Sequence, residues 1–169
     1  MGTASNVGLG VCNVTINSVD IGHTKDGVEF SYEPVYKDVT VDQYGETPID
    51  SRLIGEKVTV KFKMAEYTLA NLGIALPFGQ YAGAANARRT FGAAAGKKAS
   101  DVYVQAVFHP KDEGTRRFDL VLYKAMVHSA IVVPFKNDEE RVIEIELQAY
   151  VDETKSDRNY LGLLGDSTA

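Results

Sequence analysis

Length, composition and charge already exclude several classes of protein. The chain has 169 residues, of which 44% are hydrophobic and 24% charged, and its 18 Lys and Arg against 23 Asp and Glu give a net charge of −5. This length suits one domain with arms, and the ordinary composition excludes wholesale disorder. No apolar run approaches the roughly 20 residues that span a bilayer, so we expect no membrane insertion. The single cysteine excludes an internal disulfide and a cysteine zinc cluster.

Two segments show the two-residue alternation of a half-buried strand. In 28–41, apolar residues alternate with glutamate and serine, and in 57–64 apolar residues alternate with lysine and threonine. Pro34 interrupts the first segment and marks an edge, a bulge or a kink, because proline has no N–H for the ladder. Between the two segments, 42–56 reads as a loop that is long for a hairpin connection and holds several apolar residues. Such groups pack beneath a loop or meet another chain.

The remaining segments complete a β-rich pattern. Leucines at helical spacing predict one helix over 66–76, ended by Pro77. The Ala/Gly-rich stretch 79–99 predicts a flexible loop, because small side chains bury little surface. Further strands are expected at 11–17, 101–109, 117–123, 125–133 and 141–151, with an N-terminal arm at 1–10 and a C-terminal tail at 152–169. We therefore expect a single, mainly β domain, a two-sheet antiparallel sandwich or barrel with one flanking α-helix.

Candidate chemistry is weak throughout the chain. His23, His109 and His128 are scattered without the spacing of a metal site, and no Gly-x-Ser-x-Gly turn exists for a nucleophile. Glu144 and Glu146 share one face of a predicted strand, which a water-facing strand explains without catalysis. We therefore expect neither an enzyme nor a metal site nor a cofactor. The surplus of loops, arms and exposed apolar segments favours a self-assembling subunit instead.

Three passages together resemble the tail tube proteins of tailed bacteriophages. The first is VEFSYEPVYKDVTVDQYGETPID at 28–50, the second comprises RLIGE at 52–56 and AEYTLANL at 65–72, and the third runs from ERVIEIELQAYVD at 140–152 to Leu164-Gly165-Asp166. They cover about two fifths of the chain, in the order expected for the family. The stretch 79–99 is the part least similar to it.

The resemblance implies a structural virion protein whose sandwich or barrel protomers form hexameric rings that stack into the tail tube, the conduit for genome ejection. Similar tubes serve contractile bacteriocins and secretion machines, which remain alternatives. The implied partners are further copies of the chain, the sheath of a contractile tail, tail-tip or baseplate and terminator proteins, and double-stranded DNA that passes through the lumen without specific binding. The implied location is the virion tail, assembled in the bacterial host cytoplasm.

The same resemblance assigns expectations to individual residues. The segment 42–56 would stack on the next ring, and the arm and tail would clasp neighbouring subunits. Acidic side chains on a lumen wall would repel phosphate and so favour sliding of DNA, although Lys61 and Lys63 on a predicted strand complicate the sign of that wall. The candidate contact residues are Tyr44, Ile49, Arg52, Leu53, Ile54, Leu161, Leu163 and Leu164, and the candidate lumen residues are Glu29, Glu33, Asp38, Glu144 and Glu146.

A β-sandwich carbohydrate or adhesion module is the alternative outside the tube-forming families. Such a module needs an exposed aromatic platform. Trp is absent from the sequence and the nine tyrosines are scattered, which disfavours this interpretation.

Overall fold

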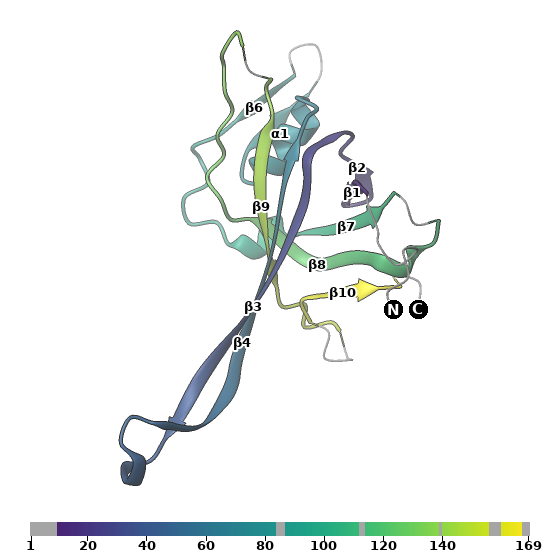
Figure 1. Cartoon of the computed structure of the whole chain (residues 1–169). Helices are drawn as coiled ribbons and strands as arrows, with labels where there is room; N and C mark the ends of the chain where they lie inside the picture. The colour runs from purple at the N-terminus through teal and green to yellow at the C-terminus, as the bar shows by residue number, and fades with distance from the viewer. Residues whose placement is uncertain (1–9, 84–86, 112–113, 139, 156–159, 167–169) are drawn as a thin grey trace.

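The computed structural model describes residues 10–83, 87–111, 114–138, 140–155 and 160–166, so the expected N-terminal arm lies outside the described residues apart from Gly10 (Figure 1). These residues form a mainly β, antiparallel fold with a single α-helix, as the sequence predicts. The strands are β1 (Cys12–Ile16), β2 (Val19–Asp20), β3 (Thr24–Thr40), β4 (Pro48–Met64), β5 (Gln80–Ala82), β6 (Arg88–Thr90), β7 (Val104–Pro110), β8 (Asp119–Val127), β9 (Ile143–Tyr150) and β10 (Gly162–Gly165). The helical segments are α1 (Leu69–Ala75) and the 3-10 turns η2 (Asp42–Tyr44), η3 (Ala99–Val102) and η4 (Arg116–Phe118).

One eight-stranded sheet makes up the body. Its strand order is β2-β1-β7-β8-β9-β4-β3, and β10 pairs with β8 beside this path. The sheet curls, because β1 near one end of the order contacts β3 at the other end. The core lies inside the curl and is filled by alternate side chains of the central strands, including Val60, Phe62, Met64, Ile143, Ile145 and Leu147.

The hairpin of β3 and β4 is the most prominent feature of the molecule. Each strand has 17 residues, and the outer half of the pair projects well beyond the body (Figure 1). The strands stay paired from Thr24–Met64 to Thr40–Pro48. We call residues 36–54 the distal hairpin. At about 3.3 Å per residue, the four strand steps from residue 36 to residue 40 extend about 13 Å before the turn begins.

The predicted loop over 42–56 is wrong in its length, because only 41–47 connects the strands and 48–56 belongs to β4. Register shifts in the β3–β4 pairing leave Ile54 and Ile49 as the extra residues of two bulges. Each bulge advances the chain by one residue and so erases the two-residue period from the sequence. The turn itself is built by η2 and by Gly45, whose φ of +63° favours glycine.

Pro34 lies in β3, which is an edge strand of the sheet. Proline is tolerated there, because the missing N–H faces away from the partner strand. Of the edge, the bulge and the kink that the sequence leaves open for Pro34, the structure confirms the edge. The outer edge of β3 pairs with no other strand of the described residues.

The helix lies where the sequence predicts it but is shorter. Thr68 caps α1, since its Oγ1 accepts a hydrogen bond of 3.1 Å from the backbone N–H of Asn71. The buried Asn71 amide donates to the backbone carbonyls of Ile21 (3.0 Å) and Glu66 (2.9 Å). The helix is thereby fixed against one end of the core, where Ala75 is buried.

Two further predictions need correction. The segments 117–123 and 125–133 form one strand, β8, which ends at Val127 where its ladder with β9 also ends. The stretch 79–99 is not wholly a loop, because β5 and β6 pair within it. Arg89 fixes this small hairpin to the helix by donating from Nε to the carbonyl of Leu69 at 3.2 Å.

The C-terminal tail is also different from the expectation, because part of it folds onto its own chain. β10 pairs with the first half of β8, and β9 pairs with the second half. β9 and β10 thus follow one another along β8. This pairing with β8 explains the apolar run at 160–164 in the tail. The sequence does not reveal the pairing, because no local turn signal connects the two strands.

Candidate assembly surface

The distal hairpin carries five of the candidate contact residues, and all five are exposed. Tyr44 at the tip is 67% exposed and Ile54 at the inner bulge is 62% exposed. Isolated exposed apolar residues are ordinary, but a row of them on one projecting element marks an interaction surface. The five are Tyr44, Ile49, Arg52, Leu53 and Ile54.

The sequence did not point to three further members of this surface: Phe30, Tyr32 and Tyr36 on β3, which are all exposed. Their alternation with polar residues predicts a strand face that packs on the core. In the structure, Phe30 and Tyr32 lie at the base of the hairpin, where they line an open groove, and Tyr36 lies on the distal hairpin beyond the body. Whether such a strand face packs on the core or stays exposed depends on how long the hairpin is. The bulges hide that length in the sequence, because they interrupt the two-residue period.

An open apolar groove of about 320 Å³ lies between the base of the hairpin and β10. Its hairpin wall is formed by Phe30, Tyr32, Glu56 and Val58, and Tyr32 donates its hydroxyl proton to Glu56 at 2.6 Å. The opposite wall holds the three C-terminal contact candidates, of which Leu161 and Leu163 are half-buried and Leu164 is 66% exposed. The remaining lining residues are Leu120, Leu122, Val151, Tyr160 and Gly162.

β10 is held against β8 at very close range. A Cβ added at Gly162 would lie 2.4 Å from the backbone oxygen of Val121, so only glycine fits there. Leu161 accepts a backbone hydrogen bond of 3.3 Å from Tyr123. The wall of the groove is therefore a fitted strand rather than a loose tail.

Asp152 anchors the chain where it leaves β9. Its carboxylate lies 2.9 Å from Lys124 Nζ and accepts from the Thr154 hydroxyl at 2.8 Å. The hydrogen bond from Lys124, followed by that from Thr154, lowers the pKa of Asp152 from 3.8 to about 2. Backbone N–H of Asp152 also donates to Tyr160, which brings β10 back towards β8.

Four of the five candidate lumen residues share the polar face of the sheet. Cross-strand pairing places Glu29 opposite Lys61, and Lys61 opposite Glu146. Residues paired directly across antiparallel strands point to the same side. By the same register Glu33 lies opposite Lys57, and Glu144 lies opposite Lys63.

Asp38 does not belong to this group. It pairs with Ser51 on the distal hairpin and accepts a hydrogen bond of 2.5 Å from the Ser51 hydroxyl. Its even position on β3 puts it on the face of Tyr36, opposite to Glu29 and Glu33. The polar face is therefore mixed in charge, and the five acidic candidates do not form a single acidic wall.

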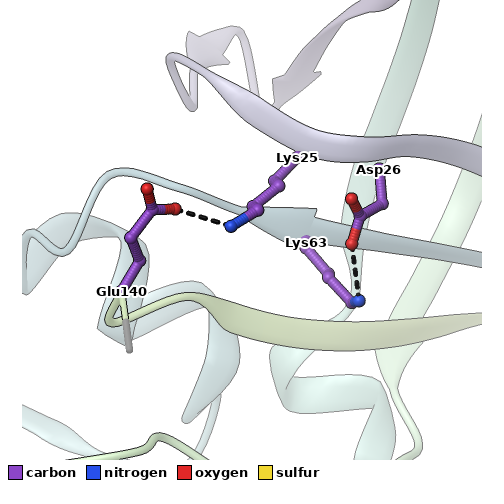
Figure 2. Close-up of polar contacts among 4 residues, drawn as sticks. All are labelled: Lys25, Asp26, Lys63 and Glu140. Atoms are coloured by element: carbon purple, nitrogen blue, oxygen red, sulfur yellow. Dashed lines mark hydrogen bonds and ion pairs between the residues drawn. The ribbon is translucent and has the colours of Figure 1, made fainter. Parts of the chain in front are cut away.

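Figure 2 shows how two lysines on neighbouring strands are accommodated. Lys25 and Lys63 are directly paired across β3 and β4, which places like charges together. A bulge at Asp26 and Gly27, both at positive φ, turns the Asp26 carboxylate to within 2.7 Å of Lys63 Nζ. Lys25 Nζ lies 2.7 Å from Glu140. These contacts raise the pKa of both lysines, first through the hydrogen bond to Glu140 or Asp26.

No group of three potential metal ligands occurs among the described residues. His109 Nδ1 lies 2.5 Å from the Asp119 carboxylate, which is 1% exposed, and this pair connects β7 to β8. In the same part of the chain, no helix has the length and apolar character needed to cross a membrane.

Comparison of the sequence with models of known protein families and with curated proteins gives no match. The surface described above therefore has to be interpreted from its own geometry.

Proposed function

We propose that this protein is a tail tube subunit, which forms hexameric rings that stack into the conduit for a phage genome. The observation that carries the proposal is the distal hairpin, a projecting element with exposed apolar side chains on an open edge strand. A soluble monomer gains nothing from such an element and risks aggregation through it. A subunit that packs against copies of itself uses it.

The free edge of the sheet supports the closure of several copies into a ring. The free edge of β3 offers backbone donors and acceptors to a neighbouring copy, and closure into a ring removes that edge. The polar face is carried by the adjacent strands β9, β4 and β3, which would line the bore together with β8 next to them in the sheet. Six copies with four strands each, about 4.8 Å apart and tilted about 45°, give a backbone diameter of about 50 Å. Side chains then leave roughly 40 Å, which admits a DNA duplex.

The groove gives the hairpin a place to bind. We propose that the distal hairpin of one copy lies in the groove of another, with Ile54 and Leu53 against the apolar lining and Arg52 near Glu56. Such a contact joins two different surfaces, so it propagates into rings or open polymers rather than closing as a dimer. Tubes of contractile bacteriocins and secretion machines would use the same geometry.

Electron microscopy of the concentrated protein tests the proposal. We expect rings or tubes with a central bore. A variant in which an Asn-Gly turn joins Tyr36 directly to Leu53 keeps the base of the hairpin and should lose the tubes, since these two residues are already paired. Phe91→Ser, at an 81% exposed aromatic outside the hairpin, is the control and should assemble normally. Wild-type particles that stay monomeric, with and without a tail-tip or baseplate partner, would refute the proposal.

Cysteine cross-linking tests the hairpin–groove contact separately. In a Cys12→Ser background, mixed I54C and L163C subunits should form a disulfide between copies, whereas I54C mixed with F91C should not. Cross-links of I54C only to itself would instead indicate a symmetric pairing of hairpins.

A further inference from the structure

Three lysines form a row on the polar face of β4. Lys57, Lys61 and Lys63 are separated by even numbers of residues, so their side chains leave the strand on the same side. The Cα atoms of Lys61 and Lys63 are about 6.6 Å apart along the strand. Each strand of a DNA duplex carries one negative charge per about 3.4 Å of helix axis, so ammonium groups at this spacing can all lie near phosphates. Taken alone, the row would bind a phosphate backbone.

Carboxylates on the flanking strands match this row. Lys61 lies between Glu29 on β3 and Glu146 on β9, and its Nζ is 3.5 Å from the Glu146 carboxylate. Lys57 is opposite Glu33. Lys63 has Glu144 opposite it on β9, in addition to the ion pair with Asp26. Lys25 lies opposite Lys63 and adds a further positive charge beside the row, and it forms an ion pair with Glu140.

We infer that the polar face is a charge-compensated wall, in which Glu29, Glu33, Glu144 and Glu146 mask a lysine row that would otherwise hold double-stranded DNA. The inference rests on the proposed function, because it explains how a bore lined by this face passes DNA without retaining it. It differs from a uniformly acidic wall. Its sliding surface comes from the pairing of each lysine with a carboxylate, which keeps the ammonium groups from exchanging counterions for phosphates.

The size of the effect follows from the number of lysines unmasked. The variant described below removes the carboxylates opposite Lys57 and Lys61, whereas Lys63 keeps its ion pair with Asp26. If Lys57 and Lys61 each contact one phosphate, the logarithm of the binding constant falls with the logarithm of salt concentration with a slope of about −1.8. Between 50 mM and 200 mM salt, this slope corresponds to a loss of affinity of about 12-fold. The wild-type face should show neither the binding nor the slope.

The test uses the full chain below its assembly concentration, so that its outcome is independent of tube formation. The probe is a fluorescent DNA duplex, and its anisotropy is measured between 50 mM and 200 mM salt. The variant E29Q/E33Q/E144Q/E146Q should bind the duplex at least tenfold more tightly than wild type, with the predicted slope. Addition of K57Q/K61Q/K63Q should abolish that binding. The control D42N/E46Q/D101N/E153Q removes as many exposed negative charges outside this face and should bind as wild type does.

Two outcomes overturn the inference: a quadruple variant that binds no better than the control, or wild type that already binds as tightly as the variant. The pairs E29Q/E33Q and E144Q/E146Q give the same test with milder changes if the quadruple variant does not fold. If tubes form but either of these results is obtained, the charge-compensated wall is refuted and the proposed function stands.

Discussion

Gly162→Ala tests whether β10 is a fitted wall of the groove. The new Cβ would lie 2.4 Å from the Val121 oxygen and 3.3 Å from a Leu122 methyl, and the nearer contact is with backbone that cannot move aside cheaply. We therefore expect β10 to separate from β8. Its separation exposes the half-buried Leu161 and Leu163.

The magnitude can be worked from that burial. Full burial of a leucine contributes about 1.5–3 kcal/mol, so two half-buried leucines together contribute roughly the same 1.5–3 kcal/mol. For a chain of this length, the melting temperature should fall by about 3–12 °C. Thermal unfolding measures the loss, and hydrogen exchange should report faster exchange at the β10–β8 ladder.

Gly55→Ala is the matched control. Gly55 also lies in a strand, but a Cβ there meets nothing within 4 Å and its φ is not in the positive range. Alanine should be neutral or slightly stabilising at this position, because it restricts the unfolded chain. Equal melting temperatures for the two variants would contradict the close fit of β10, and tubes formed normally by Gly162→Ala would contradict the role of the groove.

Three further predictions concern the supports of the fold. Asp152→Asn should lower the melting temperature at neutral pH, and the difference from wild type should shrink as the pH falls from about 4 to about 2, since a carboxyl with a lowered pKa stabilises the fold only while it is ionised. A difference at pH 2 as large as that at neutral pH would refute the ion pair as its source. Thr68→Ala should cost about 1 kcal/mol in chemical denaturation through loss of the α1 cap, whereas Thr68→Ser should retain most of it; equal losses would rule out capping. His109→Ala, which takes the imidazole from the buried Asp119 carboxylate, should cost about 1–3 kcal/mol in the same assay, and no change would mean that this contact contributes nothing.

The sequence predicts those parts of the fold in which apolar residues recur with a single strand-like or helix-like period. Residues 57–64 alternate cleanly because each alternate side chain enters the core, and α1 is signalled by its leucines and by the proline that follows. The distal hairpin escapes prediction since its bulges at Ile49 and Ile54 break the period. β10 escapes because its partner lies some 40 residues earlier in the chain, at a distance where no local pattern reports pairing.

The candidate surface divides in the same way. Tyr44, Ile49, Leu53 and Ile54 could be named from the sequence because apolar groups in a presumed loop are conspicuous, although all of these except Tyr44 proved to lie in a strand. Phe30, Tyr32 and Tyr36 could not be named, because an apolar strand face normally meets its own core. The charge balance of the polar face depends on register between strands, and register is a tertiary property that only the paired structure supplies.

The other margins of the sheet sharpen the argument for assembly. β2 covers part of the β1 edge, and β10 occupies the half of β8 that β9 leaves open. The fold thus protects edges within its body by short local strands, whereas β3 extends 17 residues with its outer edge unpaired among the described strands. Because the edges of β1 and β8 are protected, the open edge is a property of the β3–β4 hairpin rather than of the whole sheet. In the assembly that we propose, the apolar face of the hairpin would pack on another copy and the polar face would meet water, so that a wall with one packed side and one solvated side would satisfy both.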